Sequence, residues 1–432
     1  MRTERRAIQL DATRAYADIV RLAGDIGIRV AGTPAEGEGA AYLAEQFRLA
    51  GLKPWEERFP IPIWRERVAA LTITGRPIPA ISPCFGGTTG ADGVTAEVVP
   101  VGDPLREEDL AGVDLAGKIA LIDSRNVYFD YPDYIQTDLL VARGAAGVIF
   151  AAGEGQQGGL PQAYYNFKRS LHQPTPPSAI VDFASAQRLA ANPGVATLHV
   201  EAEVTWAESV SVLADLPGSE RPDEIVIVSA HHDSVWTSPG ASDNAGGCVV
   251  VAELARTFAA GPPPRRTIRF AQWGGHEVGL WGSETWLGRH VDEIGRIAAV
   301  INFDGQGVVA GSDYASILGS PSWQRLVEAT LASGGDPVAV SVGGGGVDSV
   351  NFAAVGRNAV NFSRWGTVGN HTPDDNLDPI GPEGLESGLR MSAAVLAAVA
   401  DEDGLDLADA PPPAQLRQTQ EWCARWGWGI AG

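Results

Sequence analysis

The feature that most constrains the fold is a regular alternation of apolar strands and helices, which begins near residue 204 of this 432-residue chain. Residues 224–230 read Glu-Ile-Val-Ile-Val-Ser-Ala, a continuous apolar run typical of a strand buried on both faces of a parallel sheet. Similar strands are predicted at 267–273, 297–303 and 358–362, and helices at 249–259, 283–290, 322–332 and 385–400. The alternation predicts an α/β fold with a doubly wound, mostly parallel sheet and helices on both faces.

The N-terminal segment is predicted to form two helices. The first spans residues 10–26, where apolar residues recur at helical spacing. The second begins at Thr33-Pro-Ala-Glu36, a capping box with proline at the first helical position, in which Thr33 accepts from the Glu36 backbone N–H and Glu36 reaches back. It ends at Gly51, which supplies the left-handed stop.

Between about residues 71 and 200, prolines and glycines are frequent and the predicted strands are short. We expect a small mixed α/β domain here, with strands at 96–100, 118–122 and 147–150 and a helix at 139–146. It would be inserted into a larger domain made of residues 1–70 and 201–432, whose tail begins at about 405. Aromatic loops at 128–131 and 164–167 are expected to shape a substrate pocket, and the tail tryptophans (Trp422, Trp426, Trp428) to dock on the core or a second subunit.

Charge and cysteine content exclude several classes of protein. The chain carries 53 acidic and 32 basic residues, a net charge of −21, which disfavours nucleic acid and anionic lipid as partners. No apolar run reaches the ~18 residues of a membrane helix, and no apolar segment follows Met1, so we expect no membrane association. Three cysteines without Cys-x-x-Cys spacing argue against disulfides and thiolate zinc sites, and favour the cytoplasm.

Ionisable residues gather where the predicted strands end. In an open α/β sheet, ligands bind at the carboxyl ends of the strands, so these residues should meet. Together they offer imidazoles and carboxylates without thiolates, a donor set of the zinc type and sufficient for two metal ions. The segments are His231-His-Asp233, Gly240-Ala-Ser-Asp243-Asn-Ala-Gly-Gly247, His276-Glu277, Asn302-Phe-Asp304 and His371-Thr-Pro-Asp-Asp375.

These segments resemble the motifs of the co-catalytic zinc aminopeptidase family, which includes bacterial leucyl aminopeptidases, glutamate carboxypeptidase and glutaminyl cyclases. The family pattern reads His-x-Asp, Gly-Ala-x-Asp-Asn-x-x-Gly, Glu-Glu-x-Gly-Leu-x-Gly-Ser, Asn-x-Asp and His-Thr-x-x-Asp. Residues 71–200, with Gly117-Lys-Ile-Ala-Leu-Ile and Gly144-Ala-Ala-Gly-Val-Ile, resemble the protease-associated domain often inserted in these enzymes. The resemblance covers most of the chain except about residues 405–432.

The resemblance implies a role for each matching residue. His231 and Asp304 would bind one metal ion, Glu277 and His371 the other, and Asp243 would bridge the two. Asp233 would hold the His231 ring in place, as carboxylates commonly do for ligand histidines. The cofactor would be two divalent ions, zinc first, with cobalt or manganese as alternatives.

One position departs from the pattern. The family's catalytic base is the first Glu of the Glu-Glu pair, and this chain has His276 there. His276 could itself be the base, it could bind substrate while another group moves the proton, or activity could be lost.

The sequence therefore predicts a two-metal hydrolase of peptide-type amide bonds, acting on small peptides or amides. The first alternative is an amidase or carboxypeptidase that cleaves N-acyl amino acids or small non-peptide amides. The second is a non-catalytic metal-binding or interaction protein. Assembly into a homo-oligomer is left open.

Overall fold

The computed structural model describes residues 9–123, 134–154, 159–165, 167–170, 175–366, 369–401 and 409–427. The chain forms two compact units. The first, called here the sheet unit, comprises residues 1–61, 207–368 and 375–432; the second, the insert unit, comprises residues 62–206 and 369–374. Two long strands, β1 (Trp55–Ile73) and β7 (Val195–Leu216), contribute residues to both units, and the sequence analysis did not predict them.

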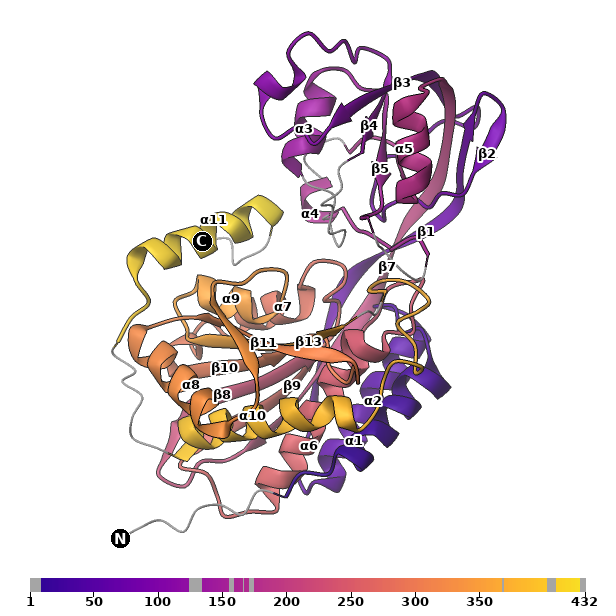
Figure 1. The fold of residues 1–432 in the computed structure, drawn as a ribbon. Coiled ribbons are helices and arrows are strands. Elements are labelled where there is room, and N and C mark those ends of the chain that lie inside the picture. Colours follow the sequence, from indigo (N-terminus) through magenta and orange to yellow (C-terminus); the bar gives the residue numbers. More distant parts are fainter. Residues whose placement is uncertain are drawn as a thin grey trace. The chain divides into compact units, whose positions relative to one another are not determined.

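The sheet unit is built on a mostly parallel sheet (Figure 1). Its strand order is β12-β11-β13-β10-β8-β9-β7. Its four central strands are parallel: β8 (Arg221–His231), β9 (Arg266–Trp273), β10 (Ile297–Phe303) and β13 (Ala359–Gly366). β11 (Gly311–Leu318) is antiparallel to β13 and parallel to β12 (Val338–Val342), and β7 is antiparallel to β9. This arrangement confirms the predicted fold class.

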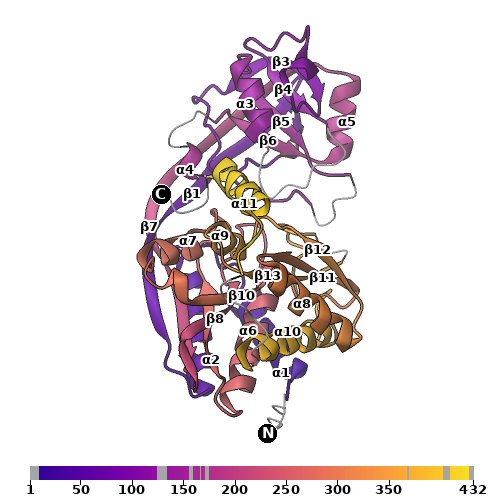
Figure 2. The same ribbon diagram turned by 90° about the vertical axis from the view of Figure 1, so that its left-hand side faces the viewer.

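Helices cover both faces of this sheet, which is why its central strands are almost entirely buried. α6 (Gly247–Ala259) and α10 (Glu383–Asp401) contact the central strands, and α9 (Ser349–Ala354) contacts β10 and β13. Figure 2 shows α9 and α7 (Trp281–Arg289) on the side of the sheet opposite α6 and α10. α8 (Pro321–Gly334) packs on α10, and the short η4 (Ile294–Arg296) precedes β10. Three N-terminal helices lie along α6 and the turn before it: α1 (Ala12–Ile19), the π-helical η1 (Val20–Ile26) and α2 (Pro34–Leu49).

The predicted cap of α2 forms, with one difference. Thr33 Oγ1 accepts from the Glu36 backbone N–H at 3.4 Å, and Gly51 takes a φ of 83° after the helix. The Glu36 carboxylate, however, accepts from the backbone N–H of Gly32 at 2.6 Å and from the Ser209 hydroxyl. The buried Glu36 side chain therefore ties α2 to β7, a contact that local sequence cannot predict.

The insert unit has its own short parallel strands. β4 (Ile119–Ile122), β5 (Gly147–Ala151) and β6 (Ser178–Val181) are parallel and fully buried. β3 (Val94–Gly102) is parallel to β4 and antiparallel to β7, and β2 (Arg76–Ile78) is antiparallel to β1. The helices are η2 (Glu107–Leu110), α3 (Tyr134–Ala142), α4 (Phe167–Ser170) and α5 (Phe183–Ala191).

Tyr164 and Tyr165 correct one expectation. Both side chains are buried inside the insert unit, Tyr164 with its ring centroid 6.2 Å from that of Phe85 and Tyr165 with its hydroxyl 3.1 Å from Ser178 Oγ. They are core residues of the insert unit rather than residues that line a pocket. The second aromatic loop, residues 128–131, lies outside the described residues.

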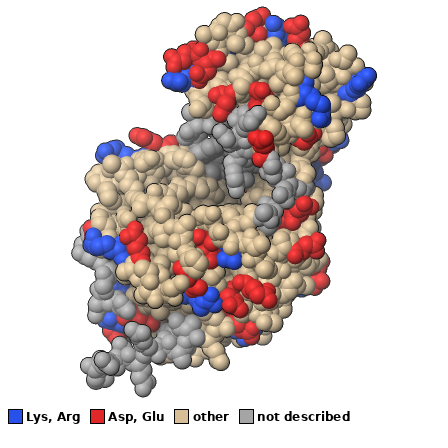
Figure 3. Space-filling model, viewed as in Figure 1, with Lys and Arg blue, Asp and Glu red and all other residues tan. Residues whose placement is uncertain are grey.

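The tail contains α11 (Pro413–Trp426), which packs against α9 and places the Trp422 ring over Gly345. The Trp426 side chain and Trp428 lie outside the description. Among the described residues, no helix combines the length and the apolar character that a membrane span requires. On the face in Figure 3, acidic side chains are scattered between uncharged residues, in keeping with the net charge of −21.

Candidate metal centre

The carboxyl ends of β8, β9 and β10 bring four of the five predicted ligands together in the sheet unit. His231 is the last residue of β8, Glu277 follows β9 and Asp304 follows β10. Asp243 lies in η3 (Ala241–Gly246), the irregular turn that precedes α6. All four side chains are buried, which is unusual for charged groups without a partner or a metal ion.

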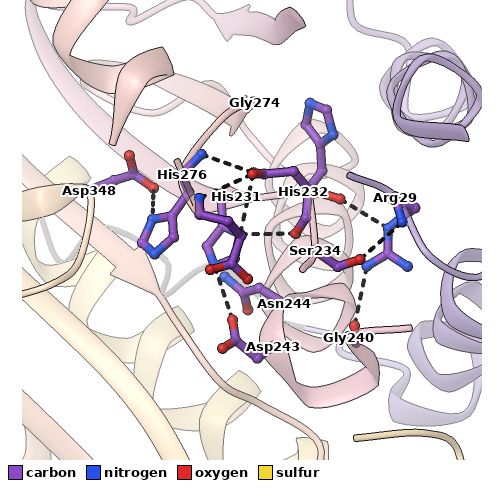
Figure 4. Close-up of polar contacts among 12 residues, drawn as sticks. Arg29, His231, His232, Ser234, Gly240, Asp243, Asn244, Gly274, His276 and Asp348 are labelled. Atoms are coloured by element: carbon purple, nitrogen blue, oxygen red, sulfur yellow. Dashed lines mark hydrogen bonds and ion pairs between the residues drawn. The ribbon is translucent and has the colours of Figure 1, made fainter. Parts of the chain in front are cut away.

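Two overlapping groups of donor atoms meet here. His231, Asp243 and Glu277 form one group, and His231, His276 and Asp304 form the other; within each group the donor atoms lie within 4.8 Å of one another. His231 Nε2 is 3.1 Å from Asp243 Oδ1 (Figure 4). It is 3.8 Å from Asp304 Oδ1. Two donors on one tetrahedral zinc ion lie ~3.4 Å apart, so these separations fit a shared divalent cation.

The charges around His231 also fit a cation. Burial acts to lower the pKa of His231, but Asp233, Asp243 and Asp304 outweigh it and raise that pKa well above its ordinary value. The carboxylates thus attract positive charge to this point, which a divalent ion would supply without a bound proton.

Asp233 holds the loop after β9. Its two carboxylate oxygens accept from the backbone N–H groups of His276 at 3.0 Å and Glu277 at 3.1 Å. Its backbone oxygen, at 3.2 Å, is the nearer partner of His231 Nδ1, and its Oδ1 lies at 3.6 Å. Burial acts to raise the pKa of Asp233, but His231 outweighs it, so the pKa lies below its ordinary value and the carboxylate stays charged.

Two buried residues, Asp375 and Arg29, hold the turn around Asp243 in place. Asp375 accepts from the backbone N–H groups of Ser242 at 2.7 Å and of Asp243 at 3.0 Å. The buried Arg29 guanidinium donates to the carbonyl oxygens of His232 at 2.9 Å and Gly240 at 3.2 Å, which fixes the loop between β8 and η3 (Figure 4).

The His276 ring is held on two sides. Its plane stacks on that of His231 with centroids 3.7 Å apart and 7° between the planes, and its Nδ1 lies 3.0 Å from Asp348 Oδ2. Burial and His231 act to lower the pKa of His276, but Asp348 and Asp304 outweigh them and raise it to about 9 in the protein without cations. Two bound dications would disfavour the protonated ring, so we expect a neutral His276 in the metal-loaded protein.

Two further histidines of the motifs, His371 and His232, are not among the two donor groups described above. His371 belongs to segment 369–374, which folds with the insert unit, and its Nδ1 lies 2.8 Å from the Gln162 backbone oxygen. Its role as a ligand stays a prediction. His232 is buried with its Nε2 2.9 Å from the Val210 backbone oxygen, so it packs in the interior of the sheet unit.

The fold and this cluster define an α/β protein with a site suited to divalent metal ions. Peptidase family M28 matches residues 211–396, and the PA domain matches residues 94–189. The aminopeptidase YwaD of Bacillus subtilis is 30% identical over 421 residues, which cover 92% of this chain and 87% of that protein. Carboxypeptidase Q of Rattus norvegicus is 26% identical and covers 67% of this chain and 64% of that protein.

Solved structures agree. A zinc aminopeptidase from Bacillus subtilis superposes with a TM-score of 0.74 at 28% identity, covering 94% of this chain and 99% of that one. An aminopeptidase from Aneurinibacillus superposes with a TM-score of 0.73 at 26% identity, covering 92% of this chain and 96% of the other. The chain belongs to peptidase family M28 and is a peptide hydrolase with an inserted PA domain. The family and the donor set confirm the expected divalent-metal cofactor.

Proposed function

We propose that the chain hydrolyses the N-terminal peptide bond of small peptides with two divalent cations, zinc first, bound at the strand ends of the sheet unit. The observation that carries this proposal is the convergence of buried donors from three strand ends on His231, at separations suited to a shared cation. The relatives named as aminopeptidases support the N-terminal specificity.

The ligands we propose are those that the sequence predicted. His231 and Asp304 would hold one ion, Glu277 would hold the second, and Asp243 would bind both. His371 is the fifth proposed ligand through the resemblance of its His-Thr-x-x-Asp motif alone. When bound, the cations would polarise the scissile carbonyl and lower the pKa of the attacking water.

The residues around the ligands have separate tasks in this proposal. Asp233 and Asp375 accept from the backbone N–H groups of Glu277 and Asp243, so the main chain of these two proposed ligands is fixed in place. Preformed ligand positions matter because a loosely held donor loses affinity and misplaces the reacting water.

A substrate panel tests the proposal. The zinc-loaded protein is assayed on aminoacyl anilides, on N-acyl amino acids and on small aryl amides, with and without a chelator. We expect turnover of the aminoacyl anilides that the chelator abolishes and added zinc restores. Turnover confined to N-acyl amino acids would favour the carboxypeptidase alternative, since carboxypeptidase Q is among the relatives of this chain. No turnover on any substrate would favour the second alternative, a non-catalytic metal-binding or interaction protein.

A matched pair of variants separates the metal centre from general loss of charge. Asp304→Asn removes a proposed ligand, whereas Asp292→Asn removes an exposed carboxylate of the same unit. We expect the first variant to lose turnover and bound zinc and the second to keep both. Equal behaviour of the two variants would contradict the assignment.

A further inference from the structure

Asp348 occupies the position before α9 where an aspartate commonly caps a helix, yet its side chain makes no capping hydrogen bond. Its carboxylate turns instead to two side chains of the loop and helix that follow β9. Oδ2 lies 3.0 Å from His276 Nδ1, and Oδ1 accepts from the Ser283 hydroxyl at 2.5 Å. The aspartate is completely buried, so these two contacts replace the hydrogen bonds that water would make to its carboxylate.

Ser283 is itself held in a fixed orientation. Its oxygen accepts from Asn351 Nδ2 at 3.0 Å, which leaves the hydroxyl proton for another acceptor. The Leu280 carbonyl oxygen lies 3.2 Å away, and the Asp348 carboxylate is both nearer and charged. Each oxygen of Asp348 therefore has one assigned donor, and its plane is set.

This arrangement selects the tautomer of His276. A carboxylate only accepts hydrogen bonds, so the hydrogen of the neutral ring lies on Nδ1 and the lone pair on Nε2. Nε2 faces the ligand cluster, 3.6 Å from Asp304 Oδ2. The stacked His231 ring, 3.7 Å away, covers one face of the imidazole and opposes its rotation.

We propose that Asp348 is the positioning residue of His276, and that the two form an imidazole–carboxylate dyad that moves the proton during peptide hydrolysis. The proposal rests on the function proposed above. Nε2 takes one proton from the attacking water as the water oxygen bonds to the scissile carbonyl carbon. The same proton passes to the leaving nitrogen as the C–N bond breaks, so the dyad returns to its starting state. The hydrogen stays on Nδ1 throughout, and Asp348 accepts its hydrogen bond without being protonated itself.

Asp348→Asn tests the dyad with little change in shape. Because Ser283 donates to Oδ1, the asparagine is expected to keep its oxygen toward Ser283 and to turn its NH₂ toward His276 Nδ1. That contact makes Nδ1 an acceptor and places the hydrogen on Nε2, the wrong tautomer for taking a proton. We expect kcat to fall by ~10²-fold or more, as for loss of a general base, with KM changed much less and bound zinc unchanged.

A double-variant comparison shows whether Asp348 acts through His276. Asp348→Asn should lower kcat in the native protein and have no further effect in the His276→Ala background, because residues that act as a unit are not additive. The control is Asp313→Asn, which removes a buried aspartate paired with Arg364 at 2.7 Å in the same unit. We expect that control to lose stability and keep kcat. Additive losses in kcat would overturn the dyad.

Two measurements do not depend on turnover. Nitrogen-15 NMR of the histidine rings in the zinc-loaded protein, with His276 identified from its absence in His276→Ala, is expected to show a hydrogen on Nδ1 and a free lone pair on Nε2. A hydrogen on Nε2 would overturn the proposal. The cobalt-substituted protein should keep its visible spectrum in His276→Ala; a changed spectrum would identify His276 as a metal ligand and also overturn the dyad. If the native protein shows the expected tautomer but hydrolyses no amide, the proposed function fails and the geometry of the pair stands.

Discussion

Both units of this protein contain parallel strands joined by helices, yet an aspartate that follows a strand has a different role in each unit. Asp182 follows β6 of the insert unit and caps α5, accepting from the Ser185 backbone N–H at 2.8 Å. Asp304 follows β10 of the sheet unit and lies buried against His231 and His276. The strand end provides a position in either unit. A candidate metal site arises only where several such side chains meet and are not already hydrogen-bonded to the backbone beside them.

The largest expected effect comes from removing the shared carboxylate of the cluster. Asp243→Ala should lower kcat/KM by ~10³-fold or more, because metal ions supply several kcal/mol of transition-state stabilisation. Elemental analysis should show the loss of at least one metal equivalent. The same assay on Asp182→Ala should give native activity. If the two aspartate variants behave alike in both assays, the different roles assigned to aspartates of the two units would be contradicted.

Metal removal should affect the folding stability of one unit more than the other. Without cations, the buried carboxylates around His231 repel one another, and a ligand present at 1,000 times its dissociation constant stabilises the native state by about 4 kcal/mol. We expect a chelator to lower Tm, with the earliest hydrogen exchange in β8 to β10. Protection lost first in β4 to β6 would contradict this expectation.

Glu36 gives the sheet unit a pH dependence of stability. Burial, with a smaller contribution from Asp233, raises the pKa of Glu36 from 4.5 to about 8 against its hydrogen bonds to Ser209 and Gly32. The folded protein therefore keeps this proton above the pH at which the unfolded chain releases it. Its contribution to stability is complete below about pH 4.5 and is lost as the pH rises toward 8. Urea midpoints from pH 5 to 8.5 should fall less in Glu36→Gln than in the native protein; parallel curves would contradict the shift.

The smallest effect concerns the cap of α5. Asp182→Ala should reduce the free energy of unfolding by ~1 kcal/mol, the usual value of a helix cap, and leave kcat and bound metal unchanged. Denaturant unfolding of the variant measures this loss. Conversely, Asp182→Asn should recover most of it, because asparagine caps nearly as well. A loss of several kcal/mol would mean that Asp182 has a larger structural role than its contacts show.

The sequence predicted the parts of this structure that depend on local patterns. Apolar runs located β8, β9, β10 and β13, and Thr33 and Gly51 marked the two ends of α2. Four predicted ligands meet because parallel strands deliver their carboxyl ends to one edge. Both the alternation and the motifs are short-range features that survive in a single sequence.

The contacts that the sequence did not reveal are long-range. Asp348 stands 72 residues from His276, and its place before α9 suggests an ordinary helix cap. Asp375 follows His371 in the same motif, yet its carboxylate accepts from the distant backbone N–H groups of Ser242 and Asp243. Tyr164 and Tyr165 looked like pocket residues because nothing local shows that their rings turn inward. Each of these contacts depends on how distant segments pack, which periodicity does not encode.

Anomalous diffraction from crystals of the zinc-loaded protein tests the central claim most directly. We expect two peaks at the strand ends of the sheet unit, one within ~2.3 Å of donor atoms of His231, Asp243 and Asp304, and the second within the same distance of Asp243 and Glu277. Data collected on either side of the zinc absorption edge identify the element. The absence of zinc from these donors, or zinc bound at other residues alone, would contradict the account.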